Sequence, residues 1–195
     1  MKFDKRILIG GFSALAGYGL YRAYVWSKRP RRVVALGTSN TAPSYSYIKT
    51  IRGKLPTGSF ATNIGYVGQG AWVIKNRGLK KALSYKPTDL IVETLSNDLA
   101  SKRSIAHMQK HNDAIFRAAK KVGARVIFLG LSPHRKGFDT MIRWIENHPA
   151  VDQVVIPWEL HDSNKHRLKN LTFKDGHFTS TGHRKLGDVL LAKAF

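Results

Sequence analysis

A chain of 195 residues is long enough to bury one sizeable hydrophobic core and leaves little room for a second. The absence of cysteine excludes disulfides, thiolate nucleophiles and cysteine-ligated zinc. The 33 lysines and arginines outnumber the 12 acids, and the formal charge of +21 predicts attraction to anionic partners such as a membrane surface, acidic wall polymers or, without sequence specificity, nucleic acid. Residues 1–32 carry +7 of this charge and the remainder +14, so the charge belongs to the whole chain.

The first 31 residues are expected to form a basic and hydrophobic membrane anchor. An uncharged run, residues 7–20, follows three basic residues, and extending it to residue 26 supplies the length of a spanning helix while including Arg22. A signal peptide cleaved near residues 14–16 and a soluble or surface-lying helix are the alternatives. The anchor predicts a membrane-associated protein, in a cell envelope or a phage virion. The flank after the run is the more basic one, which favours a cytoplasmic body and conflicts with a secreted enzyme.

From residue 32 onward, short apolar segments alternate with helical patterns. The predicted strands are residues 32–36, 59–63, 90–95, 126–131 and 151–156. The predicted helices are residues 43–55, 71–84, 104–122, 140–147 and 180–194. Helices between strands predict one three-layer α/β/α domain over residues 32–195, with a mainly parallel sheet covered on both faces. In such folds the chemistry collects on loops at the carboxyl ends of strands, here the loops of Ser39, Gly68, Asn97 and His177.

Ser39 is the best candidate for a nucleophile. It directly follows the first predicted strand, on a turn that begins at Gly37. The amino-terminal N–H groups of the helix predicted after it would favour developing negative charge. The alternative is that Thr38, Ser39 and Asn40 only cap that helix.

Two further loops carry groups that can bind an anion. The loop after the second strand has glycines at positions 65, 68 and 70, whose N–H groups can approach a ligand, although their spacing is not that of a dinucleotide-binding loop. Asn97 ends the third strand with an amide that can donate to an oxyanion. The alternative for this segment is an Asx turn in which Asp98 caps the residues that follow.

A tight loop near the carboxyl terminus holds Asp175, Gly176 and His177. In a Ser/His/Asp arrangement, the imidazole takes the serine proton while a carboxylate orients the ring. An acid and a histidine on one loop are therefore what a serine nucleophile elsewhere in the chain requires.

Together these blocks resemble those of the SGNH (GDSL-like) hydrolase family. Gly37-Thr38-Ser39 stands where the family usually has Gly-Asp-Ser, and Asn63 with Gly68 matches the second block. Leu95-Ser96-Asn97-Asp98 stands for the usual Gly-x-Asn-Asp, and the Asp175–His177 loop with the trailing Gly182-His183 matches the last block. The four blocks are in order and cover residues 32–195.

The resemblance implies a flavodoxin-like SGNH hydrolase fold and a serine esterase or deacylase that uses no metal or cofactor. By this resemblance Ser39 is the nucleophile, His177 the general base and Asp175 its orienter. The N–H groups of Ser39 and Gly68 and the amide of Asn97 form the oxyanion hole.

The substrate implied is an acetyl or acyl ester on an envelope polysaccharide, peptidoglycan or a lipid. Loops around residues 133–140 and 158–169 are expected to shape the pocket. The alternative is an SGNH-fold envelope or virion structural protein of little or no activity that binds anionic lipid or nucleic acid.

Three positions depart from the family pattern. Thr38 replaces the usual Asp and Leu95 the usual Gly, at positions that support the reacting groups. The family places its aspartate three residues before the histidine, whereas Asp175 is two residues before His177. Either Gly176 lets the backbone bend so that the carboxylate reaches the ring, or a Ser-His dyad is helped by a backbone carbonyl or a distant acid such as Asp162.

Overall fold

The computed structural model of the protein describes residues 29–195. Most of the predicted anchor, residues 1–31, lies outside this range and stays a prediction. Among residues 29–195, no helix is both long enough and apolar enough to cross a membrane.

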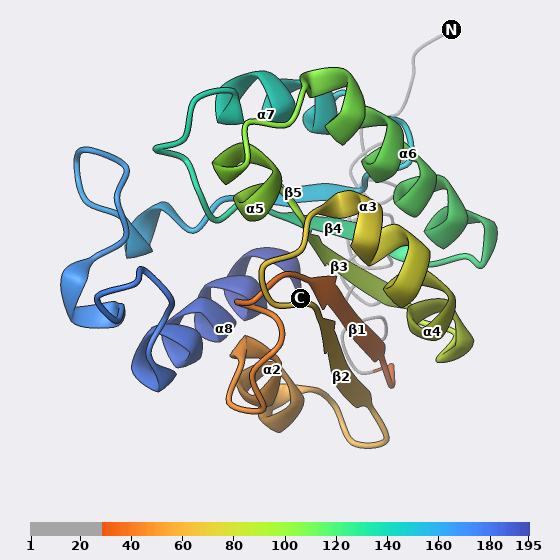
Figure 1. Cartoon of the computed structure of the whole chain (residues 1–195). Coiled ribbons are helices and arrows are strands. Elements are labelled where there is room, and N and C mark those ends of the chain that lie inside the picture. Colours follow the sequence, from red (N-terminus) through yellow and green to blue (C-terminus); the bar gives the residue numbers. More distant parts are fainter. Residues whose placement is uncertain (1–28) are drawn as a thin grey trace, which may run out of the picture.

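Five parallel strands form one sheet in the order β2-β1-β3-β4-β5 (Figure 1). They are β1 (Arg32–Gly37), β2 (Phe60–Gly65), β3 (Asp89–Glu93), β4 (Arg125–Leu129) and β5 (Gln153–Val155). Every residue of the central strand β3 is buried, as expected for a parallel strand covered on both faces. The predicted parallel sheet is therefore confirmed.

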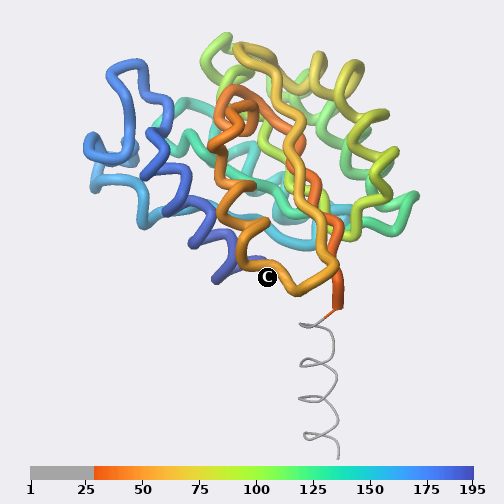
Figure 2. Tube along the Cα trace, turned by 90° about the horizontal axis from the view of Figure 1, so that it is seen from below, coloured from red at the N-terminus to blue at the C-terminus, as the bar shows by residue number. Residues whose placement is uncertain are grey.

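The helices form two layers, one on each face of the sheet (Figures 1 and 2). One layer pairs α2 (Tyr47–Lys54) with α8 (Ser180–Ala194). The other contains α3 (Ala71–Val73), α4 (Leu79–Ser84), α6 (Ile105–Lys121) and α7 (Phe138–Glu146). A π-helical turn, Ile74–Gly78, joins α3 to α4, and the short α5 (Leu95–Ala100) follows β3. The three-layer α/β/α architecture is the one that the sequence predicts.

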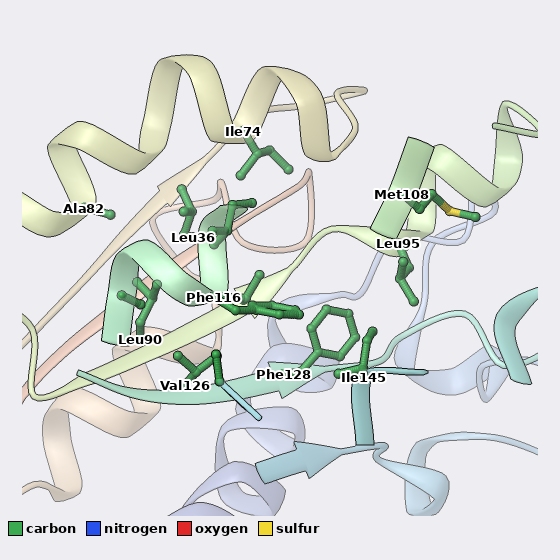
Figure 3. Packing of buried hydrophobic residues seen from close by; sticks show 14 of the residues in the cluster. Leu36, Ile74, Ala82, Leu90, Leu95, Met108, Phe116, Val126, Phe128 and Ile145 are labelled. Carbon is green, nitrogen blue, oxygen red and sulfur yellow. The ribbon is translucent and has the colours of Figure 1, made fainter. Parts of the chain in front are cut away.

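Successive side chains of a strand point to opposite faces of the sheet, so the core consists of two clusters, one on each face. On β1, Val34 and Leu36 belong to the cluster under α3, α4, α6 and α7, whereas Val33 and Ala35 belong to the cluster under α2 and α8. Phe116 on α6 and Phe128 on β4 lie at the centre of the first cluster, with their ring centroids 6.0 Å apart (Figure 3).

The second helical layer is tightly packed. A Cβ at Gly187 of α8 would lie 2.6 Å from Cβ of Thr50 and 2.9 Å from the carbonyl oxygen of Tyr47, so only glycine allows α8 to approach α2 this closely. The hydroxyl of Thr179 accepts the N–H of Gly182 at 3.2 Å and caps the start of α8. This close packing fixes where the loop before α8 leaves the body of the protein.

Several predicted boundaries are wrong by a few residues, and two of them affect the candidate site. The helix predicted over residues 43–55 begins only at Tyr47 with Ser46 as its N-cap, so Thr38, Ser39 and Asn40 do not cap it. The side-chain amide of Asn63 donates to the carbonyl oxygens of Thr41 and Ala42 at 2.7 and 3.1 Å, which holds this segment in turns. The strand predicted over residues 90–95 ends at Glu93, and residue 95 begins α5.

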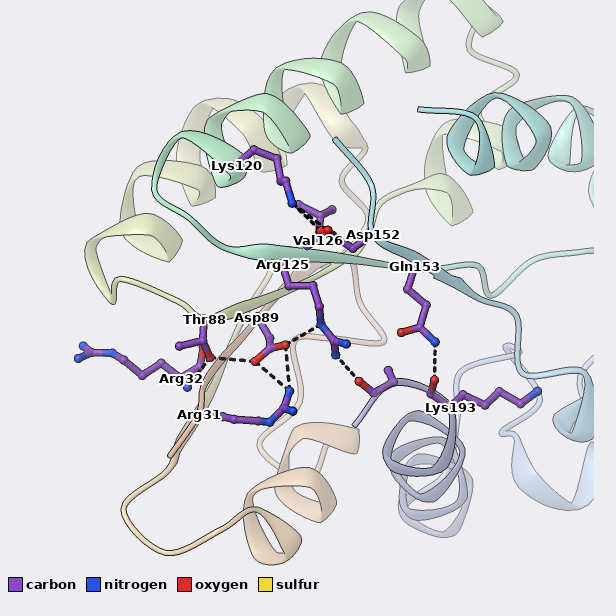
Figure 4. A network of polar contacts seen from close by, with 11 residues as sticks. Arg31, Arg32, Thr88, Asp89, Lys120, Arg125, Val126, Asp152, Gln153 and Lys193 are labelled. Carbon is purple, nitrogen blue, oxygen red and sulfur yellow. Dashed lines mark hydrogen bonds and ion pairs between the residues drawn. The ribbon is translucent and has the colours of Figure 1, made fainter. Parts of the chain in front are cut away.

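A buried ion-pair network joins the amino ends of three strands (Figure 4). The Asp89 carboxylate at the start of β3 is 3.2 Å from Nη1 of Arg31 and 2.9 Å from Nε of Arg125. It also accepts the hydroxyl of Thr88 at 2.8 Å. Arg125 in turn donates to the last residues of α8, at the Ala194 carbonyl, so this network ties the sheet to the carboxyl-terminal helix.

The buried ring of His183 makes the stability of the protein depend on pH. The ring is 1% exposed and lies among Tyr45, Tyr47 and Phe178, with no hydrogen-bond partner for Nδ1 in the part of the chain that the structure describes. Burial, and secondarily the charges of Arg167 and His177, lowers the pKa of His183 from 6.5 to about 4. Between these values the unfolded chain binds the extra proton, so stability is full above pH 6.5 and is lost as the pH falls toward 4.

We therefore expect His183 to account for a loss of about 2 kcal/mol in the free energy of unfolding between pH 7.5 and 5. Urea denaturation of the wild type and of His183→Leu at both pH values measures this contribution. The variant should lose less stability on acidification than the wild type, and the exposed control His166→Gln should behave as the wild type does. An unchanged pH dependence in His183→Leu would contradict this assignment.

Candidate active site

Ser39 lies on the turn that follows β1. A Cβ at Gly37, the last residue of β1, would lie 2.4 Å from Oγ1 of Thr41 and 2.7 Å from the carbonyl oxygen of Glu93. Only glycine therefore lets the chain turn this tightly against the end of β3. The turn is closed by the N–H groups of Thr41 and Ala42, which donate to the Thr38 carbonyl at 3.0 and 3.1 Å.

The structure brings Ser39 together with His177 and Asp175. Nε2 of His177 is 2.8 Å from Oγ of Ser39, although the two residues are 138 positions apart in the sequence. Nδ1 of the same ring is 3.0 Å from Oδ2 of Asp175. With Nδ1 protonated and donating to the carboxylate, Nε2 is free to accept the serine proton.

The turn that carries Asp175 and His177 explains how an aspartate only two residues away reaches the ring. Gly176 has φ +84°, a left-handed conformation that favours glycine, and its N–H donates to the Phe173 carbonyl at 2.9 Å. The N–H of Phe173 donates to the His177 carbonyl at 2.8 Å and closes the turn. The backbone therefore bends as the first of the two sequence-based alternatives requires.

The Asp175 carboxylate divides its oxygens between the backbone and the ring of one residue. Oδ1 accepts the N–H of His177 at 3.0 Å, while Oδ2 faces Nδ1. The backbone hydrogen bond first, and then the imidazole, lower the pKa of Asp175 below its usual value. Asp162, the distant alternative, instead accepts the N–H groups of Asn164 and His166 in its own loop.

Asn97 faces the same cleft as Ser39, but it lies on α5 and not at the end of a strand. Its Nδ2 donates to the Gln69 carbonyl at 2.9 Å, which uses one of its two N–H bonds and fixes the amide. Gly68, with φ +70°, lines an adjoining hollow that shares Asn97 with the cleft, and it is not among the residues that line the cleft itself.

The cleft around Ser39 is small and polar. Its volume is about 320 Å³, and each of its lining side chains is a serine, asparagine, histidine, arginine or aspartate, with Gly176 completing the wall. This volume is at the lower end of the range for ligand pockets, and such pockets are usually lined by apolar side chains.

Comparison with solved structures gives matches along most of the chain. A protein described as lipolytic and of the G-D-S-L family, from Desulfitobacterium hafniense, has a TM-score of 0.71 at 19% identity, covering 82% of this chain and 97% of that one. An acetyl xylan esterase has a TM-score of 0.68 at 16% identity, covering 84% and 100%. An SGNH-hydrolase family esterase has a TM-score of 0.61 at 21% identity, covering 84% and 94%. The chain has the SGNH hydrolase fold.

Sequence comparison finds no such match. No family model matches the sequence, and no curated protein does. The identities to SGNH hydrolases of known structure, 14% to 21%, establish the shared fold, and the roles of individual residues must be argued from their geometry.

The structure shows why threonine can stand at position 38, where the SGNH pattern has aspartate. The reason is Glu93, a residue that the sequence did not single out. Glu93, 1% exposed at the end of β3, accepts the N–H and the hydroxyl of Thr38 at Oε2, at 3.0 and 2.5 Å. Its Oε1 accepts the hydroxyl of Ser96 at 2.9 Å, and Ser96 accepts that of Ser132 at 3.1 Å. An acid that ends an otherwise apolar strand, Leu-Ile-Val-Glu, is the sequence signal that could have identified Glu93.

Arg167 is the second residue that the sequence did not single out. It donates to the Leu131 carbonyl from Nε and Nη2, at 3.2 and 3.1 Å, and to the Gly176 carbonyl from Nη1 at 2.6 Å. Its guanidinium also lies over the ring of Phe178, 4.7 Å from the centroid. Arg167 thus ties the turn of His177 to the chain that follows β4.

Asp98 does not cap the residues that follow it, contrary to the Asx-turn alternative. Its Oδ2 accepts the N–H of Ala71 at 2.9 Å, so it caps α3 and not the residues that follow it. A Cβ at Gly70 would lie 1.9 Å from Oδ1, which makes glycine necessary at this contact. Burial raises the pKa of Asp98.

We expect the family's usual aspartate to destabilise this protein at position 38. Thr38→Asp would place a second carboxylate against the buried Glu93, with a loss of about 2 kcal/mol or more in the free energy of unfolding at pH 7. Thr38→Ser, which keeps the hydroxyl, is the matched control in urea denaturation. A Thr38→Asp protein as stable as the wild type would contradict the role given to Glu93, and adding Glu93→Gln should restore part of the loss.

Proposed function

We propose that the protein is a serine esterase that removes a small acyl group, such as acetyl, from a polar alcohol. The observation that carries this proposal is the alignment of Ser39, His177 and Asp175, with both ring nitrogens of His177 at hydrogen-bond distance from their partners. A purely structural or binding protein has no need of this alignment.

In the proposed reaction, Ser39 Oγ attacks the ester carbonyl carbon while Nε2 of His177 takes its proton. Asp175 keeps Nδ1 protonated and stabilises the imidazolium that forms. The tetrahedral intermediate collapses, and the leaving alcohol takes the proton from Nε2. Water then attacks the acyl-enzyme by the same steps, which releases the carboxylic acid and restores Ser39.

The oxyanion of each intermediate needs hydrogen-bond donors. In the proposed mechanism these are the N–H of Ser39 and the second Nδ2–H of Asn97, since the first is bonded to the Gln69 carbonyl. The N–H of Gly68 would join them from the adjoining hollow, which shares Asn97 with the cleft. One such donor contributes about 3 kcal/mol to stabilising the transition state.

The character of the cleft supports a short acyl group. A long acyl chain gains its binding energy by burying CH₂ groups against apolar walls, and no apolar side chain lines the cleft among the described residues. Similar structures include both a lipolytic protein and an acetyl xylan esterase, so they do not choose between these substrates. A polar cleft of about 320 Å³ favours an acetyl ester of a glycan over a lipid.

A fluorophosphonate probe tests the nucleophile. The wild type should be labelled, and Ser39→Ala should not be, because the probe bonds to the activated serine oxygen. Ser84→Ala, which removes an exposed serine hydroxyl on α4, is the control and should label as the wild type does. Labelling of Ser39→Ala at the wild-type rate would disprove the proposed nucleophile.

The contribution of the acid can be measured separately. Asp175→Asn should lower kcat for an acetyl ester by roughly 10- to 100-fold with little change in KM, because it weakens the general base without removing it. His177→Ala should cost more than Asp175→Asn. The reason is that the side chain of Asp175 is 65% exposed, so water can partly replace its carboxylate. A larger loss of kcat in Asp175→Asn than in His177→Ala would contradict the roles of His177 as general base and Asp175 as its orienter.

A further inference from the structure

Two arginines and two histidines line one side of the Ser39 cleft, and the arginines carry its positive charge. Arg135 and His134 come from the loop after β4, and His166 and Arg167 from the loop that precedes the His177 turn. The only carboxylate that lines the cleft in residues 29–195 is that of Asp175, and both its oxygens are engaged by His177. The cleft wall is therefore positive beside the nucleophile.

The charge of Arg167 is held by carbonyl groups and not by an acid. Its three hydrogen bonds go to the carbonyl oxygens of Leu131 and Gly176, and no described carboxylate lies within ion-pair distance. Glu93 acts on it only from further away. Burial lowers the pKa of Arg167 to about 10, which leaves it a cation at neutral pH.

Arg135 is exposed at the rim of the same cleft. Its guanidinium makes no hydrogen bond or ion pair with any residue that the structure describes, and it lies between the cleft and a neighbouring hollow, both of which it lines. A planar guanidinium binds carboxylate and phosphate groups through two parallel hydrogen bonds.

The loop of Arg135 contacts the loop of Arg167, which keeps the two positive charges close to each other. The rings of His134 and His166 stack with their centroids 4.7 Å apart, which joins the loop of Arg135 to that of Arg167. The positive charge of Arg135 acts unfavourably on both His134 and Arg167. A bound anion would relieve this repulsion, and it would do so next to Ser39.

We propose that the alcohol part of the substrate carries an anionic group, a carboxylate or a phosphate, that binds at Arg135 on the Arg167 side of the cleft. This inference rests on the proposed esterase function and narrows its substrate from polar esters to acidic ones. The general charge of +21 draws anions to the whole surface, whereas Arg135 selects the ester whose charge lies close to the scissile bond.

Matched acetyl esters test this selection. We would compare kcat/KM for 4-acetoxybenzoate and for 4-acetoxyphenyl phosphate with that for the neutral methyl 4-acetoxybenzoate. The anionic esters should be preferred by about 3- to 10-fold at low ionic strength. Arg135→Gln should abolish the preference, and the two anionic esters distinguish carboxylate from phosphate recognition.

Lys136→Gln is the matched control, because it removes one positive charge at the next residue. Lys136 lines a neighbouring hollow and not the Ser39 cleft, so the preference should persist in this variant. Equal kcat/KM for charged and neutral esters in the wild type, or a preference that survives Arg135→Gln, would overturn the proposal.

A binding measurement separates failure of this inference from failure of the esterase function. If no ester turns over and the fluorophosphonate probe does not label Ser39, the esterase proposal fails. Binding of benzoate and of inorganic phosphate to Ser39→Ala, followed by the NMR ring resonances of His134 and His166, then still tests the anion site. Shifts that are lost with Arg135→Gln and kept with Lys136→Gln support the site, and equal shifts in all variants, or none, refute it.

Discussion

A buried carboxylate stands at each end of the central strand β3, and each one joins β3 to both of its neighbours. At the amino end, Asp89 pairs with Arg31 before β1 and with Arg125 of β4. At the carboxyl end, Glu93 accepts Thr38 after β1 and reaches the segment after β4 through two serine hydroxyls. Buried charges are tolerated only when they are paired or hydrogen-bonded. The contacts of Asp89 and Glu93 therefore form only when the ends of β1, β3 and β4 lie in register.

This constraint determines where Ser39 lies. Thr38 is held by Glu93 through both its N–H and its hydroxyl, so the next residue leaves β1 in a fixed direction. The cleft is then completed by the loop of Arg167, whose guanidinium bonds both to the chain that follows β4 and to the His177 turn. Ser39 and His177 are thus both positioned by polar contacts near the carboxyl edge of the sheet.

The sequence predicts the strands and helices of each layer well because apolar residues recur along them at the spacing of a buried strand or of a helix face. The interiors of β1 and β3 are apolar, and α6 and α8 begin and end within a residue of their predicted limits, with Ser104 and Thr179 as their N-caps. The start of α2 could not be predicted in this way. It depends on an amide, that of Asn63, which comes from another strand and holds the intervening carbonyls.

In the candidate site too, the residues that local sequence patterns locate differ from those that depend on distant partners. Short motifs locate Ser39, Asn97 and the Asp175–His177 turn, and the conformation of Gly176 explains how a shortened spacing still reaches the ring. Glu93 and Arg167 act through partners that are distant in sequence, so a local pattern such as the acid at the end of Leu-Ile-Val-Glu locates Glu93 but not what it binds. Asp175 and His177 lie on one five-residue turn, whereas Ser39 is 138 residues from His177. Contact between Asp175 and His177 is thus a product of local folding, whereas contact between His177 and Ser39 requires the carboxyl-terminal segment to dock onto a completed sheet. Under the proposed function, turnover would therefore report that docking.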